Sequence, residues 1–316
     1  MVPKNLENTI VIIGSTASGK SELAHFISKY YNSTWQKTAI INLDAFQIYK
    51  ELNAGTAKPT IYEQQEYEYH GLNICNIQEN IDALKFSEIC IEYKNEILNQ
   101  NKIAICVGGS GLYLRAFLHG LDEVPSRSPE IRNEIRKKAE DYGWTWCYEW
   151  LKKIDLKRSE QIHQNDKIRI ERALEIYLST GKPMSEFESK NEVLHEQKLN
   201  FPCSIIYTDR PKDDLKNRIQ KRVVQMIENG WIEEVENLYK KYGENLFEFY
   251  SMRAIGYIEI LNFIKNKDKN KNELIEKINS RTWQYAKRQI TWNSKEKKHY
   301  IWHTEEQKLI PYENYK

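Results

Sequence analysis

A glycine-rich octapeptide near the N-terminus has the residue types and spacing that bind phosphate. It fits the pattern GxxxxGK[ST] and comprises Gly14, Ser15, Thr16, Ala17, Ser18, Gly19, Lys20 and Ser21. Glycine lets the backbone curl so that successive N–H groups point at phosphate oxygens, and a following helix adds the positive end of its dipole. Lys20 supplies a cation, and the Ser21 hydroxyl can ligate Mg²⁺. We therefore predict a phosphate site with Mg²⁺ as its cofactor.

The phosphate loop alone leaves the reaction open, and Asp44 adds a second chemical group. The loop could hold ATP for a kinase or NTPase, or a diphosphate that leaves as pyrophosphate. Asp44 directly follows a β-rich segment, and open α/β sheets place their ligand crevice beyond the carboxyl ends of the strands. A carboxylate at that place can accept a proton from a weak nucleophile, or it can merely cap the turn.

The elements that must position these groups alternate between strands and helices. Apolar, β-branched runs at 9–13, 38–43 and 102–107 predict buried strands. Segments 22–31 and 86–100 between them have helical character. Strands that alternate with helices imply right-handed crossovers and a parallel sheet, so we predict an α/β fold built on a P-loop core with helices on its faces.

The middle of the chain departs from this alternation. Residues 119–199 are charged and rich in helix formers, which predicts an inserted helical domain. Strand-like segments at 201–208 and 299–302 then return to the sheet. The predicted catalytic core therefore comprises residues 1–118 together with 200–316.

Composition excludes several classes of protein. Of the 316 residues, 40% are hydrophobic and 29% are charged, which is typical of a globular chain rather than a disordered one. No apolar run approaches the ~20 residues of a membrane-spanning helix, and the N-terminus lacks the features of a secretory signal. The five cysteines form no CxxC pair. We expect a cytoplasmic protein with reduced thiols, without a membrane partner and monomeric.

One helical segment near the C-terminus mixes cations with aromatic side chains. Arg281, Tyr285, Arg288 and Trp292 follow one another at intervals that place them on a single helix face. Such a face suits a nucleic acid, because cations track phosphates and aromatic rings stack on bases. It could also be an ordinary solvated face, since the net charge of the chain is only +2.

Seven segments together resemble the tRNA dimethylallyltransferase (tRNA isopentenyltransferase) family, in its order and near its spacing. The most specific are GTAKP at 55–59, within the family's DSxQVY…IGTAKP element, and AKRQITW at 286–292. The remaining segments are the phosphate loop, DAFQIY at 44–49, VGGSGLY at 107–113, the stretch from Ile162 to Glu175, and RAIGY at 253–257.

The resemblance implies a reaction. The exocyclic amine of a flipped adenosine, 3′-adjacent to the anticodon of a tRNA, attacks C1 of dimethylallyl diphosphate, which leaves isopentenyladenosine in the tRNA. It implies Asp44 as general base, Thr16 as a group that orients the amine, and Arg222 near the diphosphate. From the residues alone, Arg222 could equally be a solvated helix residue, and Thr16 a small loop residue without a catalytic contact.

The resemblance also implies a tRNA-binding role for the insertion and the anticodon stem-loop as the partner. The contact residues that it implies are Asp44, Ala45, Phe46, Gln47, Ser110, Arg132, Ile168, Arg169, Arg172, Arg253, Gly256, Tyr257, Arg281, Lys287 and Arg288.

Three positions depart from the family pattern. Ser15 replaces a proline of the loop, Ala45 replaces a serine beside Asp44, and Asn73 replaces an aspartate. The alternatives are an adenylate dimethylallyltransferase, with a free nucleotide as acceptor, a P-loop nucleoside or metabolite kinase, and a non-catalytic RNA-binding protein. Prenyl transfer to tRNA rather than to AMP would distinguish the first of these.

Overall fold

The structure of the protein is a computed structural model. The residues that it describes are 2–3, 5–34, 36–121, 124–125, 127–187, 198–266, 270–304 and 306–315. The chain forms two compact units. One contains Met1–Gly120 and Leu199–Lys316, and the other contains Leu121–Lys198.

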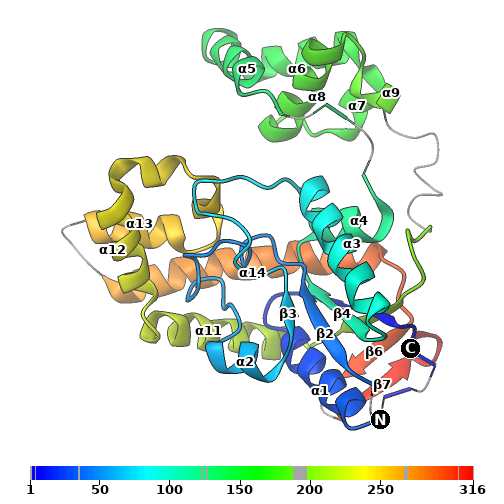
Figure 1. The fold of residues 1–316 in the computed structure, drawn as a ribbon. Coiled ribbons are helices and arrows are strands. Elements are labelled where there is room, and N and C mark those ends of the chain that lie inside the picture. The colour runs from blue at the N-terminus through cyan, green and yellow to red at the C-terminus, as the bar shows by residue number, and fades with distance from the viewer. Residues whose placement is uncertain are drawn as a thin grey trace. The chain divides into compact units, whose positions relative to one another are not determined.

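The larger unit is built on a seven-stranded sheet with the order β3-β2-β4-β1-β5-β6-β7 (Figure 1). Every neighbouring pair is parallel except β6 and β7, which are antiparallel. The strands are β1 Thr9–Gly14, β2 Thr38–Asn42, β3 Tyr69–His70, β4 Ile103–Gly108, β5 Ser204–Thr208, β6 Tyr300–His303 and β7 Lys308–Pro311. The predicted α/β class, a mostly parallel sheet flanked by helices, is confirmed.

Hydrophobic runs explain why the central strands form where they do. All six residues of β1 are buried, which is typical of a parallel strand covered on both faces. The predicted strands agree with the structure to within one residue, except that the segment predicted from residue 201 becomes a strand only at Ser204, just after Pro202. Strands β3 and β7 were not predicted.

Helices of this unit cover both faces of the sheet. Helix α1 packs against β1, β2 and β4, whereas α3 packs on β2 and β4, and α14 packs on β1. Figure 1 shows α14 as a long orange helix beside α11. The helices are α1 Lys20–Asn32, α2 Ile61–Glu66, α3 Ala83–Asn99, α4 Gly111–His119, α11 Lys212–Glu228, α12 Trp231–Tyr242, α13 Tyr257–Lys265 and α14 Lys271–Lys295. The 3-10 turns are η1 Gly243–Glu248, η2 Tyr250–Arg253 and η3 Tyr312–Asn314.

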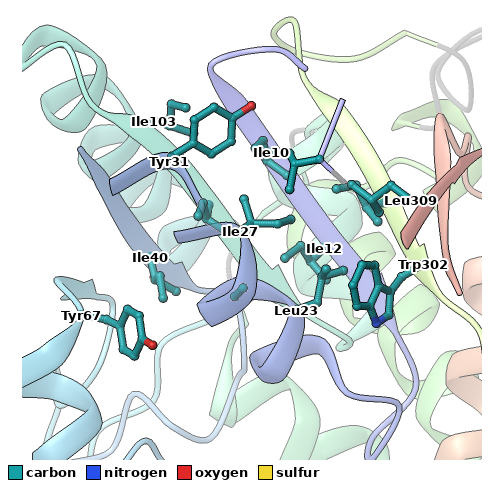
Figure 2. Close-up of a cluster of buried hydrophobic side chains, with 14 residues drawn as sticks. Ile10, Ile12, Leu23, Ile27, Tyr31, Ile40, Tyr67, Ile103, Trp302 and Leu309 are labelled. Atoms are coloured by element: carbon teal, nitrogen blue, oxygen red, sulfur yellow. The ribbon is translucent and has the colours of Figure 1, made fainter. Parts of the chain in front are cut away.

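A core between α1 and the sheet fixes the helix that follows the phosphate loop. Leu23 and Ile27 of α1 pack in one cluster with Ile10 and Ile12 of β1 (Figure 2). All four side chains are fully buried. Because α1 starts at Lys20, this packing also fixes the start of the helix beneath the loop.

The smaller unit is helical. Its helices are α5 Pro129–Tyr142, α6 Trp144–Ile154, α7 Leu156–Gln161, α8 Lys167–Thr180 and α9 Met184–Phe187. They enclose a core of their own that includes Ile135, Cys147, Leu151, Ile170 and Leu174. Residues 188–197 of the predicted insertion lie outside the described part of the chain.

Two composition-based predictions can be compared with the structure. All five cysteines are free thiols in buried positions. Among the described helices, none has the length and apolar character that crossing a bilayer requires.

Candidate active site

A cavity of about 700 Å³ opens in the larger unit at the carboxyl ends of β1, β2 and β4. It brings together residues that are far apart in the sequence. Of the predicted catalytic and binding residues, those that line it are Thr16, Ala17, Gly19, Lys20, Ser21, Asp44, Phe46, Gln47, Arg222, Arg253, Arg281 and Arg288. Gly14, Ser15 and Ser18 lie behind this surface in the phosphate loop, and all three are buried.

The phosphate loop is held in shape by contacts behind the cavity wall. The Ser18 hydroxyl donates to the Ser15 carbonyl (2.8 Å) and hydrogen-bonds the Thr208 hydroxyl on β5 (2.5 Å). Gly14 has a φ of +155°, and a Cβ there would lie 2.1 Å from the Thr208 Oγ1, so only glycine fits. Gly19, with φ +97°, ends the loop in a left-handed conformation just before α1.

The lysine of the loop is folded back onto the backbone. Lys20 Nζ donates to the carbonyls of Gly14 (3.1 Å) and Ser15 (2.7 Å). Burial and the nearby Arg222 guanidinium lower the pKa of Lys20 to about 7, against the opposing attraction of Asp44. A phosphate in the loop would supply the negative charge that favours the protonated amine.

Arg222 is a cation without a direct partner. It lies on α11 and lines the cavity. No hydrogen bond or ion pair joins its guanidinium to another group in the part of the chain that the structure describes. Burial lowers its pKa, and Asp44 acts in the opposite direction. Arg222 is partly buried, and a cation with reduced access to water is costly without a counter-charge, which distinguishes Arg222 from a fully solvated helix residue.

Asp44 lies two residues beyond β2 and presents a carboxylate to the cavity. Its Oδ1 accepts a hydrogen bond from the Phe46 N–H (2.9 Å). The Asn42 Oδ1 accepts a hydrogen bond from the Asp44 N–H (3.1 Å), which fixes the backbone at Asp44. Among the described residues, no group donates to Oδ2. The carboxylate therefore caps a turn with one oxygen, and this capping does not engage the other oxygen, so the role of Asp44 as a general base stays a prediction.

The cavity carries an excess of positive charge. Its walls hold seven cationic side chains but only two carboxylates. The cations are Lys20, Arg218, Lys221, Arg222, Arg253, Arg281 and Arg288, and the carboxylates are Glu22 and Asp44. Such a surface attracts phosphate groups, whether of a small diphosphate or of a polynucleotide.

Oxygen donors suited to Mg²⁺ are few, and this fits a metal that binds mainly through phosphate. The Ser21 hydroxyl lines the cavity, and within the described ranges no protein group hydrogen-bonds it. No cluster of three or more His, Cys, Asp or Glu side chains arranged for a metal occurs among the described residues. Mg²⁺ often keeps several waters and takes one or two protein ligands plus substrate phosphates, so Ser21 fits such a site.

Two arginines bind backbone carbonyls of the phosphate loop, and the sequence motifs did not single them out for this role. Arg218 donates to the Ala17 carbonyl (2.9 Å) and pairs with Glu22. Arg210 donates to the Ser18 carbonyl (3.1 Å). Ala17 itself has a left-handed φ of +61°. The two guanidinium groups thus engage carbonyls of the loop, so these oxygens are already paired.

The wall formed by the GTAKP segment is cross-linked by side chains. The Gln47 amide donates to the carbonyls of Thr56 (3.1 Å) and Ala57 (3.3 Å). Lys58 donates to the Asn73 side chain (2.7 Å), at one of the positions that depart from the family pattern. Burial lowers the pKa of Lys58 to about 8.

A buried tryptophan explains two of the glycines. The Trp231 indole is 1% exposed and lies between Gly55 and Gly256, where a Cβ would approach it to 2.0 and 2.1 Å. Tyr257 packs edge-on against it and donates to Glu234 (2.7 Å). Gly256 and Tyr257 were predicted tRNA contacts, but both are buried, and the structure gives them a packing role.

Helix α14 turns several predicted residues toward the cavity. Arg281, Tyr285 and Arg288 line it, and Arg281 pairs with Glu259. Tyr285 hydrogen-bonds the Ser110 hydroxyl (3.2 Å), and burial, with the charge of Asp44, raises the pKa of Tyr285 to about 12. Trp292 instead packs against Gly111, so this face continues past the cavity rather than forming one open surface. Lys287 points to solvent.

Gln289, also on α14, was not predicted as a site residue. It is 4% exposed; its Oε1 accepts from the Thr16 N–H (2.7 Å), and its Nε2 donates to the Gly109 carbonyl (2.8 Å). The only sequence signal for it was its place inside the segment AKRQITW.

Phe46 belongs to an aromatic group at the cavity. Its ring lies nearly parallel to that of Tyr250, with centroids 6.4 Å apart, and the Arg253 guanidinium lies 5.1 Å from the Tyr250 ring centre. Flat surfaces of this kind suit stacking with bases. Ala45, in contrast, is buried.

In the smaller unit, two predicted RNA contacts are engaged in an ion network. Arg132 forms two hydrogen bonds to Glu175, each 3.0 Å, and pairs with Glu171. Arg172 donates to Glu175 (2.7 Å) and to the Pro125 carbonyl (2.6 Å). Glu175 is fully buried, so this network has a structural role. The Arg169 and Ile168 side chains are exposed.

Comparisons with known proteins agree with this geometry. Residues 47–296 match the family described as IPP transferase. A tRNA dimethylallyltransferase 2 of Geotalea daltonii is 34% identical over 91% of this chain and 85% of its own length. A tRNA delta(2)-isopentenylpyrophosphate transferase structure from Staphylococcus epidermidis is 30% identical, with a TM-score of 0.62 over 92% of this chain and 91% of that one.

A eukaryotic dimethylallyltransferase structure, described as acting on tRNA, superposes with a TM-score of 0.74 and 28% identity. It covers 90% of this chain, and this chain covers 70% of it. The matched range and the coverage of these relatives show the family. The chain belongs to the IPP transferase family, with the tRNA dimethylallyltransferases, and is a transferase.

Proposed function

We propose that this chain transfers a dimethylallyl group from dimethylallyl diphosphate to N6 of the adenosine 3′-adjacent to the anticodon in tRNAs. The observation that carries the proposal is that one cavity holds both a phosphate loop and a carboxylate, of which one oxygen has no donor among the described residues. The family and its tRNA-modifying relatives support the same reaction.

In the proposed reaction the adenine N6 forms a bond to C1 of the donor while the bond from C1 to the diphosphate oxygen breaks. The electron pair leaves with the diphosphate, and the N6 proton passes to Asp44. The backbone N–H of Phe46 already donates a hydrogen bond to Oδ1 of that carboxylate. Oδ2 is therefore the oxygen that accepts the proton. An aromatic amine is a weak nucleophile, and a positioned base is expected to contribute about 10²–10⁴-fold in rate.

The departing diphosphate gains negative charge as the bond breaks. Lys20, Arg222 and the loop N–H groups would stabilise that charge, and fixed groups of this kind often supply the largest part of catalysis. Ser21 would hold Mg²⁺, which when bound neutralises charge on phosphate oxygens. The lowered pKa values of Lys20 and Arg222 are consistent with sites that await an anion.

The acceptor would be held by α14 and by the aromatic group at Phe46. Arg281 and Arg288 suit phosphates, and Phe46 with Tyr250 offers rings on which a base can stack. A base inside a stack cannot enter a cavity, so the adenosine must be flipped out of the anticodon loop.

Labelled donor distinguishes this proposal from its alternatives. We expect label in an anticodon stem-loop with adenosine after the anticodon, but not in the same stem-loop with guanosine there, nor in AMP. Asp44→Asn should slow transfer by about 10²–10⁴-fold, whereas Asp213→Asn, at an exposed side chain of α11, should not. Chelation of Mg²⁺ should also stop transfer. Label in AMP alone, or ATP hydrolysis without transfer to RNA, would contradict the proposal.

A further inference from the structure

Gln289 joins two loops that end neighbouring strands of the sheet. Its carboxamide accepts from the Thr16 N–H of the phosphate loop at 2.7 Å and donates to the Gly109 carbonyl after β4 at 2.8 Å. The side chain is 4% exposed, so water does not compete for these hydrogen bonds. The Thr16 N–H therefore points at Gln289 and not into the cavity.

The bridge is closely packed against Gly109, where no side chain would fit. A Cβ at Gly109 would lie 2.6 Å from Gln289 Nε2, 2.7 Å from the Gly14 carbonyl oxygen and 3.3 Å from Lys20 Nζ. Gln289 and Lys20 thus contact the same part of the phosphate loop. A shift of this side chain would move the backbone that carries the phosphate-binding N–H groups.

Only a side chain that both donates and accepts satisfies this bridge. Glutamate has the same shape but would place a carboxylate oxygen against the Gly109 carbonyl, and methionine would leave the Thr16 N–H without an acceptor. A buried donor or acceptor that loses its partner costs about 1–3 kcal/mol. The site therefore selects glutamine on chemical grounds and not only on volume.

The same helix also carries the cations that we assign to RNA. Arg288 is the immediate neighbour of Gln289, and Arg281 lies two turns earlier; both line the cavity. Tyr285, one turn before Gln289, hydrogen-bonds Ser110, in the same turn as Gly109. One stretch of α14 thus touches the predicted RNA site and the phosphate loop.

We propose that Gln289 is a positioning residue that couples RNA binding on α14 to diphosphate binding in the phosphate loop. RNA that fixes this stretch of α14 fixes the Gln289 bridge, and the bridge holds the loop in its anion-binding form. The proposal rests on the proposed function, because it takes RNA and a diphosphate as the two ligands. Linkage requires the coupling to be reciprocal: each ligand raises the affinity for the other by the same factor.

The test measures the dissociation constant of inorganic pyrophosphate with Mg²⁺, with and without a saturating anticodon stem-loop. For the wild type we expect binding to tighten by about 5–150-fold when RNA is present, the usual range of coupling. Gln289→Glu and Gln289→Met should bring this ratio close to one. The matched controls are Gln284→Glu and Gln284→Met, at an exposed position of the same helix, and they should keep the wild-type ratio.

A purely structural role would give a different result. It would weaken pyrophosphate binding equally with and without RNA and leave the ratio unchanged, and that outcome overturns the proposal. Thermal melting of each variant identifies those that fail to fold. If Gln289→Met does not fold, the ratio is measured on Gln289→Glu, which is closest to glutamine in shape. A wild type that transfers the prenyl group but shows a ratio of one overturns the coupling alone. Coupling without prenyl transfer overturns the proposed function alone.

Discussion

Two partly buried arginines in this molecule have opposite surroundings. Arg132 in the smaller unit is clamped by Glu175 and Glu171. Arg222 in the larger unit faces a cavity, and among the described residues its guanidinium has no hydrogen-bond partner. Burial alone would lower the pKa of Arg132, but the hydrogen bonds and charge of Glu175 raise it. For Arg222 burial prevails, and the pKa is lowered.

The difference separates a cation that serves the fold from one that serves a ligand. A buried ion pair with its hydrogen bonds in place leaves nothing for a ligand to gain. A buried cation without a partner makes the ligand-free protein less stable, and an anion that enters removes this cost. The paired arginine therefore has a structural role, whereas the unpaired one lies where we propose that the diphosphate binds.

Among the changes that test this comparison of paired and unpaired cations, the largest effect should come from Arg222. Arg222→Gln removes a cation from the leaving group, and we expect kcat/KM for prenyl transfer to fall by about 10²–10³-fold. Because the ligand-free protein loses a partly buried charge that has no counter-charge, its melting temperature should not fall. Lys212→Gln, at an exposed position on the same helix, is the control. A variant with full activity would place the diphosphate elsewhere.

Arg132 should give the opposite result. Arg132→Gln leaves Glu175 with fewer donors, although Arg172 and the Ser128 N–H still bind it. We expect unfolding of the smaller unit to be easier by about 1–3 kcal/mol, read by circular dichroism during denaturation. Lys137→Gln, exposed on the same helix α5, should change little. Unchanged stability for Arg132→Gln would show that the network does not stabilise this unit.

Lys20 should make anion binding depend on pH. Its pKa is about 7 in the ligand-free protein, well below that of the unfolded chain, so the stability of this state should rise with pH between about 7 and 10. Bound pyrophosphate favours the protonated amine, so binding takes up a proton above pH 7. Affinity should then fall by up to about tenfold per pH unit, and calorimetry in buffers of different ionisation enthalpy measures the uptake.

Lys20→Met removes this group, and proton uptake above pH 7 should disappear with it. Uptake that persists in this variant would assign the titration to another group and weaken the contrast between paired and unpaired cations.

The smallest expected effect converts an unpaired cation into a paired one. Asn73→Asp places a carboxylate beside Lys58, whose Nζ is 2.7 Å from the Asn73 side chain. We expect a gain of about 0.5–1 kcal/mol in the free energy of unfolding. The pKa of Lys58 is lowered to about 8 in the unmodified protein. The Lys58 amine is therefore charged, and its charge destabilises the folded state, mainly below that pH. The gain should therefore be greatest below pH 8 and shrink toward pH 10, as measured by thermal melts.

Much of the fold was predictable from local patterns. The runs at 9–13, 38–43 and 102–107 gave the central strands, because a strand covered on both faces must be continuously apolar. Strand β3 has only two residues, too few for any pattern. Strand β7 contains Lys308 and Pro311, which local propensity disfavours, and it forms because it pairs with β6.

The site was predictable only where its residues follow one another in the sequence. The phosphate loop and Asp44 could be located because each adjoins a strand. The Gln289 bridge joins residues 273 positions apart, and no periodicity reports such a contact. Likewise, the sequence shows that Arg132 and Arg172 are cations but not that Glu175 engages both. The packing of Trp231 against Gly55 and Gly256, which leaves no space for a side chain at either glycine, also becomes visible only in the folded structure.

The outer strands of the sheet have a consequence for solubility. An exposed strand edge offers unpaired backbone groups that can recruit another copy of the chain and begin aggregation. Here one edge, β3, spans two residues, and the other, β7, spans four and carries Lys308 and Pro311. A short edge offers few hydrogen bonds, lysine adds repulsion between copies, and proline has no N–H to donate. The sheet can thus stay open at both sides without templating fibres.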